Sequence, residues 1–135
     1  MGRSLLILLD THVVIWLAQD HRRVSPAAQR AIGKAREEDR GLAVSCITLV
    51  EIVRLSSHGR IRLTPSVETV LSEVEHRFIV LPITGNIALQ AFELPVAYPK
   101  DPADRIIGAT ALVEDVPLVT ADREIHKSRV VPTIW

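Results

Sequence analysis

An apolar run passes directly into a helical pattern in the stretch LLILLDTHVVIWLAQ, residues 5–19. The continuous run Leu5–Leu9 is typical of a strand that is buried on both faces of a parallel sheet. After Asp10, apolar residues recur at helical spacing, which predicts a helix over Thr11–Gln19. A buried strand, an acidic residue and a helix in this order indicate a protein in which strands and helices alternate.

The rest of the chain repeats this alternation. Apolar runs predict further strands over Leu42–Ser45, Phe78–Pro82 and Pro117–Thr120, with a fifth at an edge over Val130–Ile134. Helical periodicity, caps and first-turn prolines predict helices over Ala27–Glu38, Ile47–Ser57, Pro65–His76 (capped by Thr64), Thr84–Glu93 and Asp101–Glu114. Strands separated by helices require right-handed crossovers. The predicted fold class is therefore α/β, with a mainly parallel sheet of four to five strands and helices on both faces.

The composition predicts one globular domain over residues 1–135. Hydrophobic residues make up 47% of the chain and charged residues 24%, which excludes a disordered protein. The formal net charge is zero, so an RNA or DNA partner would have to be bound by a local basic patch. Cys46 is the only cysteine and no apolar stretch approaches the roughly 18 residues of a membrane helix, which together favour the reducing cytoplasm and no membrane.

Four acidic residues that are far apart in the sequence are predicted to meet. Asp10 directly follows the first strand, and Asp122 lies two residues after the fourth. Glu51 lies about one turn into the helix after the second strand, and Asp104 lies in the first turn of its helix. In an open parallel sheet, functional groups gather beyond the carboxyl ends of the strands. All four carboxylates are therefore expected at one edge of the sheet.

Such a cluster has a chemical use. Neighbouring carboxylates repel one another and their pKa values rise unless a cation lies between them. Oxygen ligands in this number suit Mg²⁺ or Mn²⁺, which can orient or ionise a water for attack on a phosphodiester. The chain has no cysteine–histidine spacing for zinc, no glycine-rich nucleotide loop and no GxSxG elbow. The acids are the only pattern in the sequence that indicates a reaction.

Each aspartate also has a purely structural interpretation. Asp10 is a suitable cap for the helix after it, and Asp122, which follows a strand, could be a turn or cap residue. Asp101, followed by a first-turn proline, is a good cap for the next helix, and Asp104 complements that helix's dipole. Neither Asp101 nor Asp104 is singled out as the metal ligand by its position alone.

The helix that carries Glu51 has its own alternative. Glu51 and Arg54 are three residues apart, so they can form a surface ion pair that explains both residues. On a helical wheel they lie opposite an apolar arc that we expect to be buried: Leu49, Val50, Ile52 and Val53.

Four segments together resemble the PIN-domain family, and within it the VapC-type toxins. These segments are LDTHVVIWL (9–17), VSCITLVEI (44–52), DPADRIIGATA (101–111) and LVTAD (118–122). The resemblance implies a three-layer α/β/α, Rossmann-like domain in which Asp10 and Asp104 hold Mg²⁺ directly. It also implies that Glu51 and Asp122 complete the acidic pocket, with Asp101 outside the direct ligands.

The resemblance also implies an activity and partners. Proteins of this type cut RNA by phosphodiester hydrolysis with Mg²⁺ or Mn²⁺, form dimers, and are neutralised by a cognate VapB-type antitoxin that occupies the cleft. The expected function is therefore that of the ribonuclease toxin in a toxin–antitoxin pair, acting in the cytoplasm as a homodimer or in a hetero-oligomer with its antitoxin.

Several residues are candidates for contacting the RNA. The basic ones lie just beyond the Glu51 helix or beside the third acid, and Thr120 is a hydrogen-bonding neighbour of the pocket; the set is Arg54, Arg60, Arg62, Arg105 and Thr120. Solvent-exposed charge or pairing with a carboxylate explains each arginine as well, and Arg105 could brace the acids. His12 and Trp16 are interpreted as structural, because the few aromatic residues form no stripe on which bases could stack.

Three other protein classes fit less well. A phosphatase of the haloacid-dehalogenase type would have a second aspartate two residues after Asp10, where this chain has His12. A phospho-receiver domain would need a lysine after a late strand, and none stands there. A PIN-like adaptor that binds RNA or a protein without cutting is the main alternative, and it would be expected to lack one of the four acids.

Overall fold

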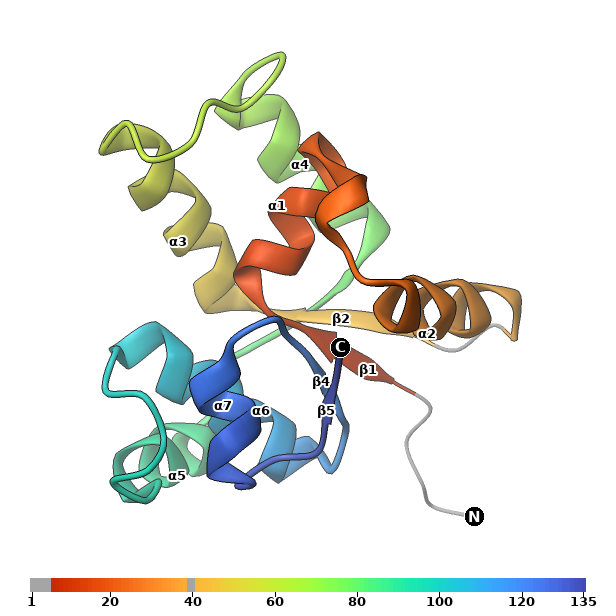
Figure 1. Ribbon diagram of the computed structural model, residues 1–135. Coiled ribbons are helices and arrows are strands. Elements are labelled where there is room, and N and C mark those ends of the chain that lie inside the picture. Colours follow the sequence, from red (N-terminus) through yellow and green to blue (C-terminus); the bar gives the residue numbers. More distant parts are fainter. Residues whose placement is uncertain (1–5, 39–40) are drawn as a thin grey trace.

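The computed structural model of the chain describes residues 6–38 and 41–135 and has a five-stranded sheet in the order β3-β2-β1-β4-β5 (Figure 1). Every neighbouring pair of strands is parallel. The strands are β1 (Ile7–Leu9), β2 (Leu42–Ser45), β3 (Ile79–Leu81), β4 (Leu118–Val119) and β5 (Thr133–Ile134). The predicted parallel α/β fold with a fifth strand at an edge is confirmed. Leu5, the first residue of the first predicted strand, lies outside the described residues.

Helices cover both faces of the sheet, which gives three layers (Figure 1). One face carries α1 (Thr11–Gln19), the 3₁₀ turn η1 (His21–Arg23), α2 (Pro26–Glu37), α3 (Cys46–Ser57) and α4 (Val67–Arg77). The other face carries α5 (Gly85–Glu93), α6 (Pro102–Glu114) and α7 (Arg123–Ser128). Among the described residues, no helix is both long and apolar enough to cross a membrane.

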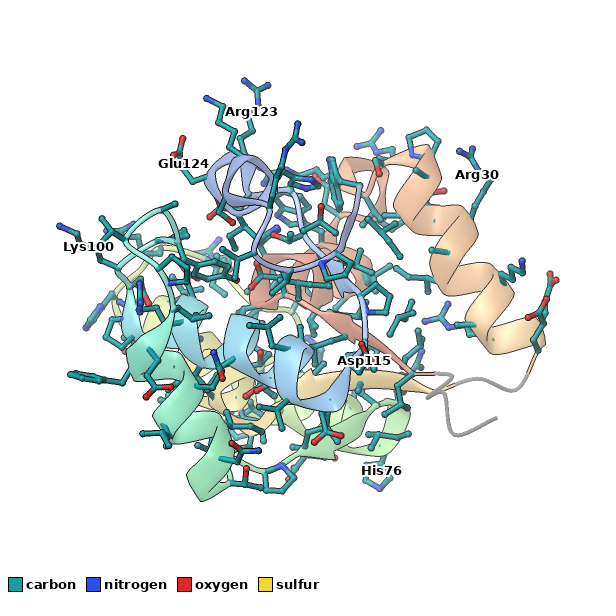
Figure 2. All side chains as sticks on the ribbon, turned by 90° about the horizontal axis from the view of Figure 1, so that it is seen from below. Arg30, His76, Lys100, Asp115, Arg123 and Glu124 are labelled. Atoms are coloured by element: carbon teal, nitrogen blue, oxygen red, sulfur yellow. The ribbon has the colours of Figure 1, made fainter. Side chains whose placement is uncertain are left out.

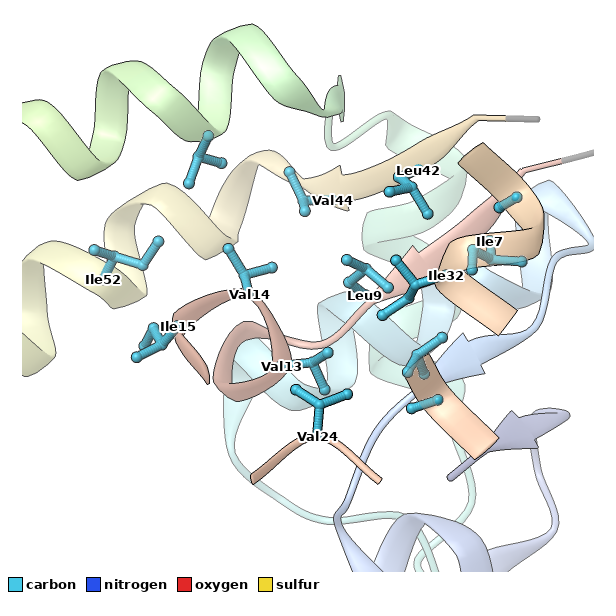
Figure 3. Close-up of a cluster of buried hydrophobic side chains, with 14 of the residues drawn as sticks. Ile7, Leu9, Val13, Val14, Ile15, Val24, Ile32, Leu42, Val44 and Ile52 are labelled. Carbon is cyan, nitrogen blue, oxygen red and sulfur yellow. The ribbon is translucent and has the colours of Figure 1, made fainter. Parts of the chain in front are cut away.

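Two hydrophobic cores hold the layers together because β1, β2 and β4, in the middle of the sheet, are buried on both faces. Ile7 and Leu9 of β1 belong to the core under α1 to α4, which Figure 3 shows in close-up. Leu8, between them, belongs to the core under α6 and α7. Alternate side chains of a strand point to opposite faces, so the continuous apolar run of β1 serves both cores.

The start of α4 differs from the prediction. The helix begins at Val67, not at Pro65, and its cap is Ser66, whose hydroxyl accepts from the backbone N–H of Thr69 at 3.1 Å. The predicted cap, Thr64, has another partner. Its N–H and C=O both bond to the side-chain amide of Gln19, at 3.0 and 3.2 Å.

The predicted apolar arc on α3 is wrong at two positions. Ile52 is fully buried, but Val50 is 58% exposed and Val53 is 43% exposed. Thr48 occupies the buried position one turn before Ile52, because its hydroxyl bonds to the hydroxyl of Thr11 at 3.0 Å. A polar side chain that forms a buried hydrogen bond can thus be buried at a helix position where hydrophobicity alone predicts a valine.

Close packing against α6 gives the first testable prediction. A methyl group added at Gly108 would lie 2.5 Å from Cζ of Tyr98, whose ring is buried. We expect Gly108→Ala to lower the free energy of unfolding by roughly 1–2 kcal/mol. The steric cost of overpacking a core is typically about 1–3 kcal/mol, whereas alanine gains at most about 1 kcal/mol of helix propensity over glycine. Thermal denaturation should show a lower Tm.

Gly33→Ala is the matched control for that variant. Gly33 also lies inside a helix, α2, but no atom lies within 4 Å of the position that its methyl group would take. Here only the gain in helix propensity remains, so we expect an unchanged or slightly higher Tm. Equal Tm changes in the two variants would contradict the packing argument.

Candidate active site

Asp10 is fixed at the carboxyl end of β1, in the middle of the sheet. Its backbone N–H donates to the carbonyl of Val119 on the neighbouring strand at 3.0 Å. One carboxylate oxygen accepts from the N–H of Thr11 at 2.9 Å, and the other accepts from the hydroxyl of Thr120 at 2.8 Å. The residue is only 3% exposed. Asp10 therefore caps α1, as the structural interpretation proposed, and it is also a buried, oriented carboxylate at the functional edge.

Thr120 joins Asp10 to Asp122. Its hydroxyl donates to Asp10 and accepts from the backbone N–H of Asp122 at 3.1 Å. Thr120 is fully buried, so the prediction that it contacts the RNA is corrected: the residue positions two acids of the pocket instead. Asp122 caps α7, with one oxygen accepting from the N–H groups of Glu124 and Ile125.

The two aspartates at the start of α6, Asp101 and Asp104, have different roles. Asp101 is the cap of α6 and accepts from the N–H groups of Ala103 at 2.8 Å and Asp104 at 3.4 Å. Asp104 follows in the first turn and is partly buried. The pKa of Asp104 is raised from 3.8 to about 7, first by burial and then by the charges of four neighbouring acids: Asp10, Asp101, Asp122 and Glu51. The charges of the other three acids that the sequence predicted to meet thus act on Asp104; Asp10, Glu51, Asp104 and Asp122 are together called the acidic pocket below.

Among the charges that raise the pKa of Asp104, that of Glu51 contributes least. Both of its oxygens accept from the guanidinium of Arg54, each at 3.0 Å, so the predicted ion pair between these residues is present. The carboxylate of Glu51 raises the pKa of Arg54, and Asp101 contributes in the same direction. Arg54 is therefore paired with Glu51, and two of the acids stabilise its charge.

The remaining basic candidates lie elsewhere. Arg60 and Arg62 line a separate hollow of about 470 Å³ in the segment that follows α3. Because α3 runs away from the sheet edge, this segment begins at the far end of the helix (Figure 1). The structure therefore does not bring Arg60 or Arg62 to the acids. Lys100 projects from the segment between α5 and α6 (Figure 2).

Arg105 has a structural role in place of the predicted contact with RNA. All three nitrogens of its guanidinium donate to backbone carbonyls of the last turn of α5 and of the segment that joins α5 to α6: those of Ala91, Leu94, Tyr98 and Pro99. These bonds use the donor groups that a phosphate would need. The candidate role of Arg105 in substrate binding is therefore corrected.

Two residues near the acids were not recognised from the sequence as part of the site. The ring of His12 accepts at Nε2 from the N–H of Ala121 at 2.9 Å, so its hydrogen is on Nδ1, which lies 3.8 Å from a carboxylate oxygen of Asp10. Tyr98 is buried beside the pocket, and burial, followed by the charges of Asp10 and two other acids, raises its pKa. Among the described residues its hydroxyl has no hydrogen-bond partner. A lone tyrosine or histidine carries no sequence pattern that would have revealed these contacts.

The acidic pocket fits Mg²⁺ or Mn²⁺ by the chemistry of its donors. Within residues 6–38 and 41–135, no three side chains of His, Cys, Asp or Glu form a ready-made metal cage. Mg²⁺ does not need one, since it commonly binds one or two carboxylates and keeps several waters. Asp10 offers an oriented carboxylate, and Asp104 offers one that is held next to other negative charges. A divalent cation would relieve that repulsion.

Comparison with known proteins agrees with this geometry. The sequence pattern of the PIN domain family matches residues 7–130. Ribonuclease VapC22 of Mycobacterium tuberculosis is 37% identical over 131 residues, which are 96% of this chain and 98% of that protein. A toxin–antitoxin complex from Klebsiella pneumoniae is 25% identical with a TM-score of 0.59 over 86% of both chains. VapBC2 from Rickettsia felis, bound to a promoter DNA fragment, shares the fold with a TM-score of 0.70 at 15% identity over 95% of this chain and 96% of that one.

Proposed function

The chain belongs to the PIN-domain family, and from this membership we propose that it is a metal-dependent endoribonuclease, the toxin of a VapBC-type toxin–antitoxin pair. The relative from M. tuberculosis is named a ribonuclease, and the K. pneumoniae neighbour is a toxin–antitoxin complex. The observation that carries the proposal is the pKa of Asp104, which the charges of four other acids and burial raise to about 7. Such mutual repulsion is typical of a site built for a cation.

In this proposal the acids divide into two pairs. Asp10 and Asp104 hold Mg²⁺, which Mn²⁺ can replace, and Glu51 and Asp122 complete the pocket. The ion, when bound, lowers the pKa of a water that attacks phosphorus and stabilises the charge that develops. Thr120 keeps the carboxylate of Asp10 turned toward the pocket through its hydroxyl hydrogen bond. Arg54, which is paired with Glu51, would contact a backbone phosphate.

The partners and location follow from the same family membership. We propose one PIN domain over residues 1–135 that acts in the cytoplasm on RNA as a homodimer. A cognate VapB-type antitoxin would cover the acidic pocket in a hetero-oligomer and so neutralise the toxin. The toxin–antitoxin complex from K. pneumoniae supports this assignment.

A cleavage assay tests the proposed activity. The purified chain, free of antitoxin, is incubated with total cellular RNA in the presence of Mn²⁺ or Mg²⁺, and a parallel sample contains EDTA. We expect discrete cuts that EDTA abolishes and that Asp122→Asn weakens strongly. Asparagine caps helices about as well as aspartate, so this variant should retain α7 and lose only the charge. Cuts that persist in EDTA, or no cuts despite metal binding to the folded chain, would contradict the proposal.

The raised pKa of Asp104 predicts an unusual pH dependence of stability. Its pKa is about 7 in the folded chain and 3.8 ordinarily, so between these values the folded state binds the extra proton. The free energy of unfolding of the metal-free protein should therefore fall as the pH rises from about 4 to 7. Asp104→Asn removes the unfavourable ionisation of this buried carboxyl. The Tm of the variant should therefore exceed that of the intact protein at about pH 8, and the difference should be smaller at about pH 5.

Addition of Mg²⁺ supplies the control for that comparison. At about pH 8, saturating Mg²⁺ should raise the Tm of the intact protein, because a ligand that binds only the folded state stabilises it. The Tm of Asp104→Asn should change little. If the Tm difference between the two proteins were the same at both pH values, the loss of stability at high pH could not be assigned to the ionisation of Asp104.

A further inference from the structure

An aromatic cluster joins the end of α1 to the C-terminal strand next to the acidic pocket. The ring centroids of Trp16 and Trp135 are 5.8 Å apart, and those of His12 and Trp16 are 4.9 Å apart. Trp16 and Trp135 are the only tryptophans in the chain, and both are partly exposed. Trp16 was interpreted as structural because the sequence shows no aromatic stripe, and its partner Trp135 lies 119 positions further along the chain.

These tryptophans border a hollow of about 560 Å³ that is also basic. Its lining combines two aromatic rings, two arginines, a histidine and one small residue: Trp16, Trp135, Arg23, Arg123, His126 and Ala121. The guanidinium of Arg23 lies over the ring of Trp16, 4.2 Å from its centroid. Arg123 projects from α7 away from the body of the protein (Figure 2). Among the described residues, neither arginine forms an ion pair, and no acid lines the hollow.

Hydrogen bonds fix the wall between the hollow and the acidic pocket. Ala121 lies between Thr120 and Asp122, and its N–H donates to the ring of His12. The Nε2 of His126 is 2.7 Å from the carbonyl of Thr120, which can only accept, so this nitrogen carries the hydrogen. One short segment thus bonds to Asp10 through the side chain of Thr120 and lines the hollow at Ala121. A ligand in the hollow would lie directly beside the acidic pocket.

From these contacts we infer that the hollow between Trp16, Trp135, Arg23 and Arg123 binds one nucleotide of the RNA strand that crosses the acidic pocket. The base would stack on indole, and the arginines would contact the adjoining phosphates. The volume suits a small ligand of this size. The inference rests on the proposed ribonuclease activity, and it gives a chain without net charge a local site for RNA.

Tryptophan fluorescence tests the inference without any cleavage. A single-stranded RNA hexamer of mixed sequence is titrated into the intact chain in EDTA. Because both tryptophans border the hollow, we expect saturable quenching. Trp135→Leu should weaken binding of the same hexamer, followed by anisotropy of a labelled copy, by roughly 5- to 100-fold, and Trp135→Phe should restore most of it. Thermal denaturation of each variant checks that it folds.

Arginine variants test the phosphate contacts. Arg23→Ala and Arg123→Ala should each weaken hexamer binding several-fold and reduce its dependence on salt. Arg30→Ala is the matched control, since Arg30 is an exposed arginine on α2 that does not line the hollow (Figure 2). We expect that variant to bind RNA like the intact chain.

The outcomes separate this inference from the proposed function. Metal-dependent cleavage by the intact chain together with unchanged hexamer binding in Trp135→Leu would overturn the nucleotide site and leave the ribonuclease in place. Binding of the hexamer that is lost in Trp135→Leu would support the site even if the cleavage assay failed. Loss of antitoxin binding in Trp135→Leu, with RNA binding intact, would also overturn the inference and assign the hollow to the antitoxin interface.

Discussion

Asp104→Asn is expected to reduce the rate of metal-dependent RNA cleavage by on the order of 10³-fold. Removal of one group that stabilises the charge of a transition state typically lowers the rate by about this factor. In our proposal Asp104 binds the ion directly, and an uncharged amide is a much weaker ligand for Mg²⁺. The substitution keeps the shape of the side chain and removes a charge that the folded protein holds next to other acids. The rate of the chemical step is measured under single-turnover conditions with excess protein.

Asp115→Asn is the matched control for this variant. Asp115 lies at the other end of the same helix, α6, in a left-handed conformation with φ of 56° that asparagine tolerates well. The chemical change is identical, but the carboxylate is not among the acids that act on Asp104. We expect an unchanged cleavage rate. Equal rates for Asp104→Asn and the intact protein would remove Asp104 from the site.

Arg105→Ala should cause the largest loss of stability, about 3 kcal/mol, since four carbonyls would lose a charged donor. The carbonyls belong to one continuous stretch, from Ala91 in α5 to Pro99 in the segment before α6, so the loss is smaller than four separate hydrogen bonds would give. For a chain of this length we expect a Tm lower by roughly 10 °C. Arg105→Lys should recover only part of this, because an ammonium cannot span the same set of carbonyls.

The comparison for this prediction is Arg77→Ala. Arg77 forms an exposed pair with Glu73 at 3.5 Å, and such pairs contribute about 0–1 kcal/mol. Its removal should change the Tm only slightly. If Arg105→Ala were as stable as Arg77→Ala and bound RNA poorly, Arg105 would be a phosphate ligand after all.

The parallel sheet explains why the acidic pocket could be predicted from the sequence. Asp10 and Asp122 follow strands, and Asp104 begins a helix that starts at the same edge, so the topology alone brings them together. Local patterns of this kind need no knowledge of distant contacts. The cap Asp101 was predictable for the same reason, because a cap acts on its own helix.

Contacts between distant segments could not be predicted. Arg105 looks like an exposed arginine in sequence, and only the path of the preceding loop turns its guanidinium toward backbone carbonyls. Val50 and Val53 fit a buried arc, but Thr48 takes the buried position through a hydrogen bond to Thr11. The short helix α7 was missed because its six residues offer no periodic pattern. For Arg105 and for Thr48, a partner from another element decided the outcome.

Direct binding of Mn²⁺ tests the central claim, that these carboxylates form one metal site, more directly than any assay of activity. The purified chain and Asp10→Asn are titrated with Mn²⁺ under identical conditions, and bound ion is measured by electron paramagnetic resonance. The proposed site predicts saturable binding to the intact chain that is lost in the variant. Equal binding to both proteins, or no binding to the folded intact chain, would contradict it.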